Sequence, residues 1–220
     1  FLHSEGHIEK VSDVREARYC AGASVDGRNP YNLLDVELAN PHALTLADLR
    51  LTTTTSACGV CGTSSIEALM KQSRYEIPQV PVDPGVVAKL PDALKAEQKQ
   101  FRKTGGIHAA GAFTLDGDPV VVREDVGRHN AADKVIGHLL MEDMLPASDL
   151  ILVMSSRASF ELVNKAAMAG FGMLVAVSAA SSLAVTTARE TGMALVGFAR
   201  GDRFNLYSGQ LSRDTLPGRS

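Results

Sequence analysis

The sequence predicts an α/β protein built on a mixed sheet with flanking helices, preceded by a smaller β-rich part. In the last third of the chain, short apolar segments alternate with helical segments, beginning with Leu150–Met154. Apolar strands that alternate with helices are typical of parallel strands covered on both faces and joined by right-handed crossovers. Two further pairs of segments are separated by turn residues, which predicts antiparallel hairpins beside the parallel strands.

The N-terminal hairpin is expected over residues 19–25 and 32–38, joined around Asp26-Gly27 and Asn29-Pro30. Its second strand alternates apolar and acidic residues, as a half-buried strand does. We assign residues 1–57 to this part. Because the chain opens on Phe1, with a segment that resembles the end of a helix, we expect this part to be truncated at its start.

Two cysteines, Cys58 and Cys61, lie in a loop of small residues directly before a helix. Ser64 with Glu67 three positions later is a capping-box pattern, and the helix it opens is expected to end before Pro78. The positive end of a helix and its free amides favour the thiolate over the thiol. A thiolate attacks sulfur, so this motif favours sulfur chemistry.

Other interpretations of the two cysteines are weaker. A structural zinc site needs four ligands, and the only other cysteine is Cys20. A structural disulfide is unusual in a chain without secretory features. A thioredoxin-type site normally follows an early strand with an aromatic residue in front, and this chain has no tryptophan. We therefore expect an active thiol and no zinc.

The middle of the chain predicts a linker and two further helices. Three prolines make residues 77–85 an extended linker, and a helix is expected from Pro91 to Lys103, stopped by Gly105-Gly106. Residues 58–103 thus form a cysteine loop with a helical segment. The α/β core, residues 104–220, opens with a hairpin of residues 107–115 and 119–123. A helix capped by Asn130, with Asp133 in its first turn, follows to Glu142.

The remaining elements alternate regularly. The expected strands are residues 150–154, 173–177, 194–199 and 205–208, and the expected helices are residues 160–169 and 183–191.

Three of these strands are followed by small or charged residues, where ligands gather in open α/β sheets. The first two loops, residues 155–159 and 178–182, are serine-rich and lead into helices, and the third is residues 200–203. Arg157, Arg200 and Arg203 supply fork-shaped donors that match phosphate. Serines that only cap helices and arginines that stay solvated are the alternative for any single loop. For three converging loops we expect a pyrophosphate pocket.

A further loop, residues 123–130, carries Arg128 and His129, which we expect either to contact an anion or to pair with Asp125 or Glu124. His108 is a weaker candidate, because a histidine at the start of a strand is more often structural.

Bulk composition excludes some classes of partner. The net charge is −3 and the apolar fraction is 45%, which argues against a nucleic-acid or membrane-surface partner held by bulk electrostatics. With only three cysteines and no export signal, the cytoplasm is the expected compartment.

In their order, these motifs resemble the formate dehydrogenase accessory sulfurtransferase family (FdhD type). The resemblance runs over most of the chain, and the matching stretches are residues 58–62, 104–110, 124–134, 155–161, 178–180 and 196–200. The resemblance implies a fold similar to cytidine deaminases, although their zinc motif is absent. It also implies a carrier that takes persulfide sulfur from a cysteine desulfurase. The resemblance implies that the recipient of the sulfur is the molybdenum cofactor in its bis-guanine-dinucleotide form, which formate dehydrogenase requires.

By this resemblance Cys58 matches the persulfide-bearing cysteine and Cys61 its neighbour. The cofactor-binding stretch is matched by Phe198, Ala199, Arg200, Gly201, Asp202 and Arg203, where Asp202 departs from the small neutral residue expected. Arg157 and Ser178 complete the expected cofactor contacts. We also expect a homodimer. The competing hypotheses are a non-catalytic cofactor chaperone, which needs the pocket but not the thiols, and a nucleoside deaminase, which needs zinc.

Overall fold

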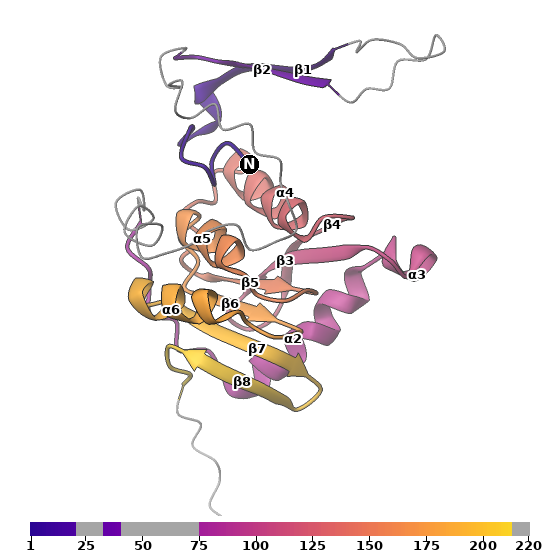
Figure 1. Cartoon of the computed structure of the whole chain (residues 1–220), viewed down its shortest axis with the longest axis vertical. Helices are drawn as coiled ribbons and strands as arrows, with labels where there is room; N and C mark the ends of the chain where they lie inside the picture. Colours follow the sequence, from indigo (N-terminus) through magenta and orange to yellow (C-terminus); the bar gives the residue numbers. More distant parts are fainter. Residues whose placement is uncertain (21–32, 41–74, 213–220) are drawn as a thin grey trace, which may run out of the picture.

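The structure, a computed structural model, describes residues 1–20, 33–40 and 75–212, and its body is a six-stranded sheet in the order β4-β3-β5-β6-β7-β8 (Figure 1). The strands are β3 (His108–Thr114), β4 (Pro119–Asp125), β5 (Leu150–Met154), β6 (Met173–Ala176), β7 (Ala194–Arg200) and β8 (Arg203–Ser208). The helices are α2 (Pro84–Glu97), α3 (Phe101–Thr104), α4 (Arg128–Met141), α5 (Phe160–Met168) and α6 (Ser182–Thr191). A short 3-10 helix, η1 (Val11–Asp13), leads into a separate sheet of β1 (Val14–Cys20) and β2 (Leu33–Leu38). The predicted class, a mixed sheet with flanking helices and a smaller N-terminal sheet, is confirmed.

The centre of the main sheet is parallel and its two sides are antiparallel. β5, β6 and β7 run in the same direction, so that Leu152 pairs with Leu174 and Leu174 with Leu195. α5 and α6 are the crossovers that join them. β3 is antiparallel to β5, β4 to β3, and β8 to β7. The predicted 107–115/119–123 hairpin is therefore the antiparallel half of the same sheet.

Helices cover both faces of this sheet, as the apolar strands predict. Successive residues of β5 point to opposite sides, because side chains alternate along a strand. Leu152 and Met154 join the hydrophobic cluster under α4 and α5, whereas Ile151 and Val153 join the cluster under α2. Figure 1 shows α4, α5 and α6 together on one side of the sheet. α4 likewise leads from β4 to β5, which run in the same direction, so α4, α5 and α6 all begin at the edge of the sheet where β4, β5 and β6 end.

The helix predicted from Pro91 begins seven residues earlier, at Pro84, and Pro91 lies inside α2. Asp83 is the N-cap and accepts hydrogen bonds from the amides of Gly85 (2.7 Å) and Val86 (3.2 Å). An Asp N-cap followed by Pro at the first position is a stronger start than Pro91 alone. The predicted stop at Gly105 is correct but belongs to α3, whose end it caps with a left-handed backbone (φ 66°). Because α2 packs on the sheet, its residues belong to the core.

The predicted N-cap of α4, Asn130, is wrong, because the helix begins at Arg128 with Gly127 as N-cap. The Asn130 side chain instead donates to Asp125 Oδ1 (3.2 Å), which also accepts from the amide of Gly127 (2.8 Å). The Asp125 side chain thus forms an Asx turn directly before α4, and it is this residue, not Asn130, that organises the start of the helix.

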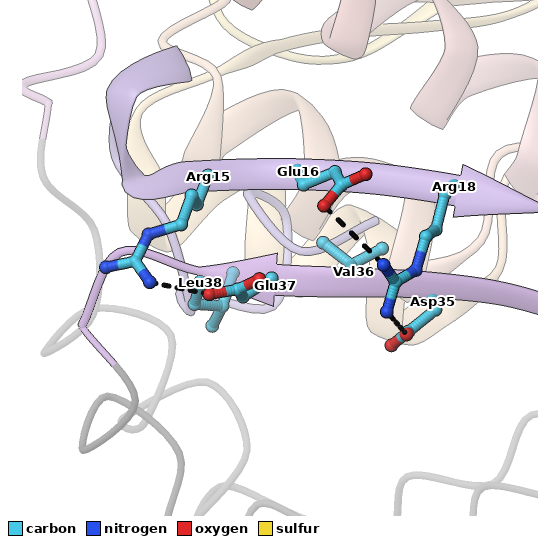
Figure 2. A pocket seen from close by; sticks show the side chains of 7 residues that line it. All are labelled: Arg15, Glu16, Arg18, Asp35, Val36, Glu37 and Leu38. Carbon is cyan, nitrogen blue, oxygen red and sulfur yellow. Dashed lines mark hydrogen bonds and ion pairs between the residues drawn. The ribbon is translucent and has the colours of Figure 1, made fainter.

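The N-terminal hairpin exists, but its first strand begins at Val14 rather than Tyr19. A hollow of about 410 Å³ lies on this ribbon. Figure 2 shows the side chains that line it, which are Arg15, Glu16, Arg18, Asp35, Val36, Glu37 and Leu38. The charges of this hollow are paired with one another: Arg15 with Glu37 at 2.6 Å, and Arg18 with Asp35 at 3.1 Å. It is a face of exposed ion pairs, which contribute little to stability.

Among the described residues, no helix is long and apolar enough to cross a bilayer.

Candidate functional site

The loops that follow β5 and β6 lie side by side at the carboxyl edge of the sheet. The amide of Ala158 donates to the carbonyl of Ala179 (3.0 Å), and the amide of Ser181 donates to the carbonyl of Ala158 (3.0 Å). A longer bond of 3.4 Å joins the amide of Ser178 to the carbonyl of Ser156. These hydrogen bonds extend the parallel pairing of β5 with β6 into the two loops. The prediction that the two loops lie next to each other is confirmed.

The third strand end reaches the second loop through a break in β7. The amide of Phe198 donates to the carbonyl of Ser178 (3.0 Å), and the pairing of β7 with β8 is irregular between Gly197 and Arg200. Phe198 has a positive φ of 52° and its side chain is 49% exposed. A left-handed backbone is uncommon for a bulky residue and is typical of bulges beside binding sites. Ser178 and Phe198, two of the predicted cofactor contacts, are therefore neighbours.

The predicted arginines of this edge carry little compensating negative charge. Arg157, Arg200 and Arg203 are exposed, and Arg200 is paired directly opposite Arg203 in the β7–β8 hairpin. Like charges opposite each other in a sheet are destabilising. Asp202 lies 3.8 Å from Arg203, in an ion pair that is almost fully exposed and therefore weak. This concentration of cations suits an oxyanion.

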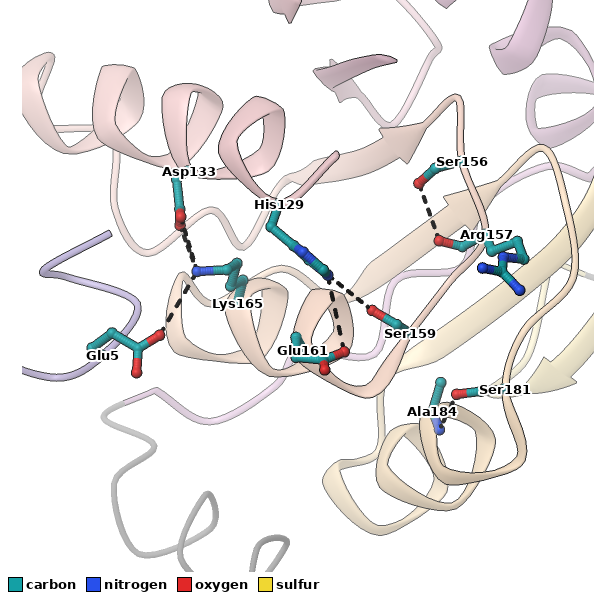
Figure 3. Close-up of polar contacts among 10 residues, drawn as sticks. All are labelled: Glu5, His129, Asp133, Ser156, Arg157, Ser159, Glu161, Lys165, Ser181 and Ala184. Carbon is teal, nitrogen blue, oxygen red and sulfur yellow. Dashed lines mark hydrogen bonds and ion pairs between the residues drawn. The ribbon is translucent and has the colours of Figure 1, made fainter. Parts of the chain in front are cut away.

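Two helices begin beside these loops with different caps. Ser181 caps α6, since its hydroxyl accepts from the amide of Ala184 (3.2 Å). Ser159 is the N-cap residue of α5 but makes no side-chain cap, and its hydroxyl lies 3.3 Å from His129 Nε2 (Figure 3). The alternative in which serines simply cap helices therefore holds for Ser181 and fails for Ser159.

The histidine partner of Ser159 comes from α4. His129 Nε2 also lies 4.0 Å from a carboxylate oxygen of Glu161 (Figure 3). A Ser-His-acid triad needs the acid on the other ring nitrogen, so this cluster is no hydrolase triad. The pKa of His129 is lowered, first because burial disfavours the imidazolium and second because Arg128 is close. The neutral ring therefore joins α4 to the loop that carries Arg157.

The acidic residues beside Arg128 and His129 are engaged elsewhere. Asp125 binds Lys134 Nζ at 2.5 Å, and Glu124 accepts from the amides of Gln100 and Phe101 at the start of α3. Burial opposes ionisation of Asp125, but the hydrogen bonds from Lys134, Gly127 and Asn130 outweigh it and lower the pKa of this carboxyl. The predicted alternative, in which Arg128 or His129 pairs with Asp125 or Glu124, is wrong.

One structural pair of the region was not predicted from the sequence. Lys165 Nζ lies 2.9 Å from both carboxylate oxygens of Asp133, which was expected only as part of a helix cap. Figure 3 shows this pair along the same α4–α5 contact as His129 and Ser159. The sequence signals only that Lys165 lies in a helix with many apolar residues, and it does not indicate a partner 32 positions away.

Two of the predicted site residues have no structural description. Cys58 and Cys61 lie outside the described residues, so their assignment stays a prediction. His108 is described: it begins β3, is half-buried and pairs with Asp125 in the β3–β4 ladder. Among the described residues, no group of three or more metal-binding side chains comes together.

The fold and the edge define an α/β protein whose strand-end loops gather arginines at one edge of a mixed sheet. Residues 1–213 match the model of the FdhD/NarQ family, and the chain belongs to this family. It is 58% identical over 215 residues to the sulfur carrier protein FdhD of Corynebacterium efficiens, covering 96% of this chain and 78% of that one. The protein of the same name from Nocardia farcinica is 53% identical over 211 residues, covering 95% and 75% of the two chains.

A solved structure has the same fold. It is of a protein assigned as a formate dehydrogenase accessory protein from Desulfotalea psychrophila, with a TM-score of 0.68 and 21% identity. The match covers 95% of this chain and 74% of that one. At this level of identity the likeness concerns the fold alone.

Proposed function

We propose that this chain is a sulfur carrier that receives persulfide sulfur on Cys58 from a cysteine desulfurase and delivers it to the molybdenum cofactor of formate dehydrogenase. The names of the curated relatives support sulfur transport. The single observation that carries the cofactor part is the convergence of three strand ends with exposed arginines at one edge, where the described residues provide only the weak ion pair of Asp202 with Arg203. The reaction is placed in the cytoplasm, where thiols stay reduced.

The first step is an exchange between sulfur atoms. The Cys58 thiolate attacks the outer sulfur of the donor persulfide, a new S–S bond forms on Cys58, and the donor cysteine leaves as thiolate. No net oxidation occurs. In the second step Cys61 attacks the inner sulfur, so that a Cys58–Cys61 disulfide forms and the outer sulfur leaves as sulfide for the metal. The two electrons come from the thiol pair, and a cellular thiol must reduce the disulfide before the next cycle.

The edge of the sheet would hold the nucleotide ends of the cofactor as substrate. Arg157, Arg200 and Arg203 match the oxygens of a diphosphate. Ser178 and Phe198, joined by a backbone hydrogen bond, belong to the same strand ends. A guanine base needs an apolar surface, and the exposed ring of Phe198 offers one. Binding at this edge would fix the position of the cofactor for the arriving sulfur.

The test separates sulfur transfer from cofactor binding. Cys58→Ala should abolish activation of formate dehydrogenase in a reconstituted assay while the affinity for GDP stays unchanged. Arg203→Ala should weaken GDP binding. Cys20→Ala is the matched control, because Cys20 lies in β1 outside this edge and its loss should affect neither measurement.

The outcomes also distinguish the chaperone alternative. If Cys58→Ala still activates the enzyme and Arg203→Ala does not, the chain is a non-catalytic cofactor chaperone. If neither variant changes either measurement, the proposed function is refuted.

A further inference from the structure

Arg128, the first residue of α4, carries a positive charge that no described residue neutralises. Its Nε atom is shielded from solvent and has no hydrogen-bond partner among residues 1–20, 33–40 and 75–212. No described carboxylate forms an ion pair with its guanidinium, and the side chain as a whole is half-buried. A shielded donor without an acceptor costs free energy, and most such donors in proteins are paired.

The nearest acids by sequence are unavailable to Arg128. Both oxygens of Glu124 are used by amides of α3, at 2.7 Å and 2.8 Å. Asp125 is bound by Lys134, by Asn130 and by the amide of Gly127. The fold thus contains carboxylates close to Arg128 in the chain, and it directs each of them elsewhere.

The place of Arg128 in the fold links it to the arginine-bearing edge. Its neighbour His129 contacts Ser159, the last residue of the loop that carries Arg157 (Figure 3). That loop is bonded to the Ser178 loop, which in turn accepts the amide of Phe198. Hydrogen bonds therefore connect the start of α4, through these loops, to the residues predicted to contact the cofactor.

We propose that Arg128 is a further anion-binding residue of this edge and that it takes a phosphate oxygen of the guanine nucleotide part of the substrate. A phosphate would supply the missing acceptor to Nε and a charge opposite to that of the guanidinium. The role rests on the proposed function, because it names one more contact for the same substrate. It is a binding role and involves no chemical step.

The test compares Arg128→Gln and Arg128→Lys in the full chain, with Lys89→Gln as control. Lys89 is an exposed residue of α2, on the opposite face of the sheet, so its replacement removes the same charge away from the edge. By calorimetric titration, Arg128→Gln should weaken GDP binding roughly tenfold or more, as the loss of a charge-assisted hydrogen bond does. The affinity of Arg128→Lys for GDP should lie between those of Arg128→Gln and the wild type, and Lys89→Gln should bind GDP with wild-type affinity.

Thermal unfolding without nucleotide separates binding from structure. Because Arg128 has no partner to lose among the described residues, Arg128→Gln should melt at the wild-type temperature or above it, while the stabilisation by GDP shrinks. A variant that melts lower and still binds GDP normally would overturn the inference. If Arg203→Ala weakens GDP binding and Arg128→Gln does not, the binding role of Arg128 is refuted while the proposed pocket stands. If the wild type does not bind GDP, the pocket and this inference fall together.

Discussion

The ion pair between Asp133 and Lys165 joins α4 to α5 one helical turn along α4 from the contact of His129 with Ser159. The Lys165 side chain is 7% exposed and that of Asp133 is 12% exposed. Ser4 adds a hydrogen bond from its hydroxyl to Asp133 Oδ1 (2.9 Å). Since both charges are shielded, removal of one should leave the other with only weak compensation from more distant and more exposed groups.

Asp133→Asn keeps the shape of the side chain and removes its charge. Of the carboxylates that the structure describes, Lys165 would then retain only that of Glu5, which lies 3.9 Å away on a more exposed side chain. Breaking a buried pair typically costs 3–5 kcal/mol, and the residual attraction of Glu5 places our expectation at the lower end, about 3 kcal/mol.

Urea unfolding followed by circular dichroism measures this loss. With a urea dependence of about 2–3 kcal/mol per molar for a chain of this size, the midpoint should fall by about 1 M. Glu37→Gln is the control, because it breaks an exposed pair with Arg15 and should cost at most about 1 kcal/mol. Asp133→Leu with Lys165→Met should recover most of the loss. If Asp133→Asn costs no more than Glu37→Gln, the pair is not shielded as described and the reasoning is refuted.

Two further predictions concern the α4–α5 contact and the bulge in β7. Folding lowers the pKa of His129 from 6.5. As the pH decreases below 6.5, this imidazole therefore takes up a proton more readily in the unfolded chain than in the folded one, and the free energy of unfolding should fall. The difference in urea midpoint between pH 7.5 and pH 5 should therefore shrink in His129→Gln, and an equal difference would contradict the assignment. Gly197→Ala places a Cβ 2.8 Å from the Tyr207 ring and 3.1 Å from the Ser178 carbonyl, so it should lower stability by about 1–3 kcal/mol and weaken GDP binding. Gly137→Ala in α4, with nothing within 4 Å, should instead be neutral or stabilising, and equal costs at the two glycines would refute the close packing of the bulge.

Much of the fold followed from the sequence because the strong signals are local. The apolar segment at residues 150–154, bounded by turn residues, could only be a buried strand or a buried helix, and its length decided for a strand. The start of α2 was misplaced because Pro84 and Pro91 both suit a first helical position, and only the hydrogen bonds of Asp83 distinguish them.

The site was predicted less completely, for a different physical reason. The loops at residues 155–159 and 178–182 could be expected to meet, because parallel strands end at one edge. The contact of His129 with Ser159 depends on how α4 lies against α5, and no local pattern encodes it. The same holds for Lys165, whose partner is 32 positions away in the chain.

Mass spectrometry of the chain after incubation with a cysteine desulfurase and cysteine tests sulfur carriage most directly. We expect the peptide that contains Cys58 to gain about 32 daltons, one sulfur atom, and to lose it on treatment with a reducing thiol. Cys58→Ala should abolish the gain and Cys20→Ala should leave it intact. A chain that gains no sulfur on this peptide, while the desulfurase itself carries a persulfide, would contradict the account.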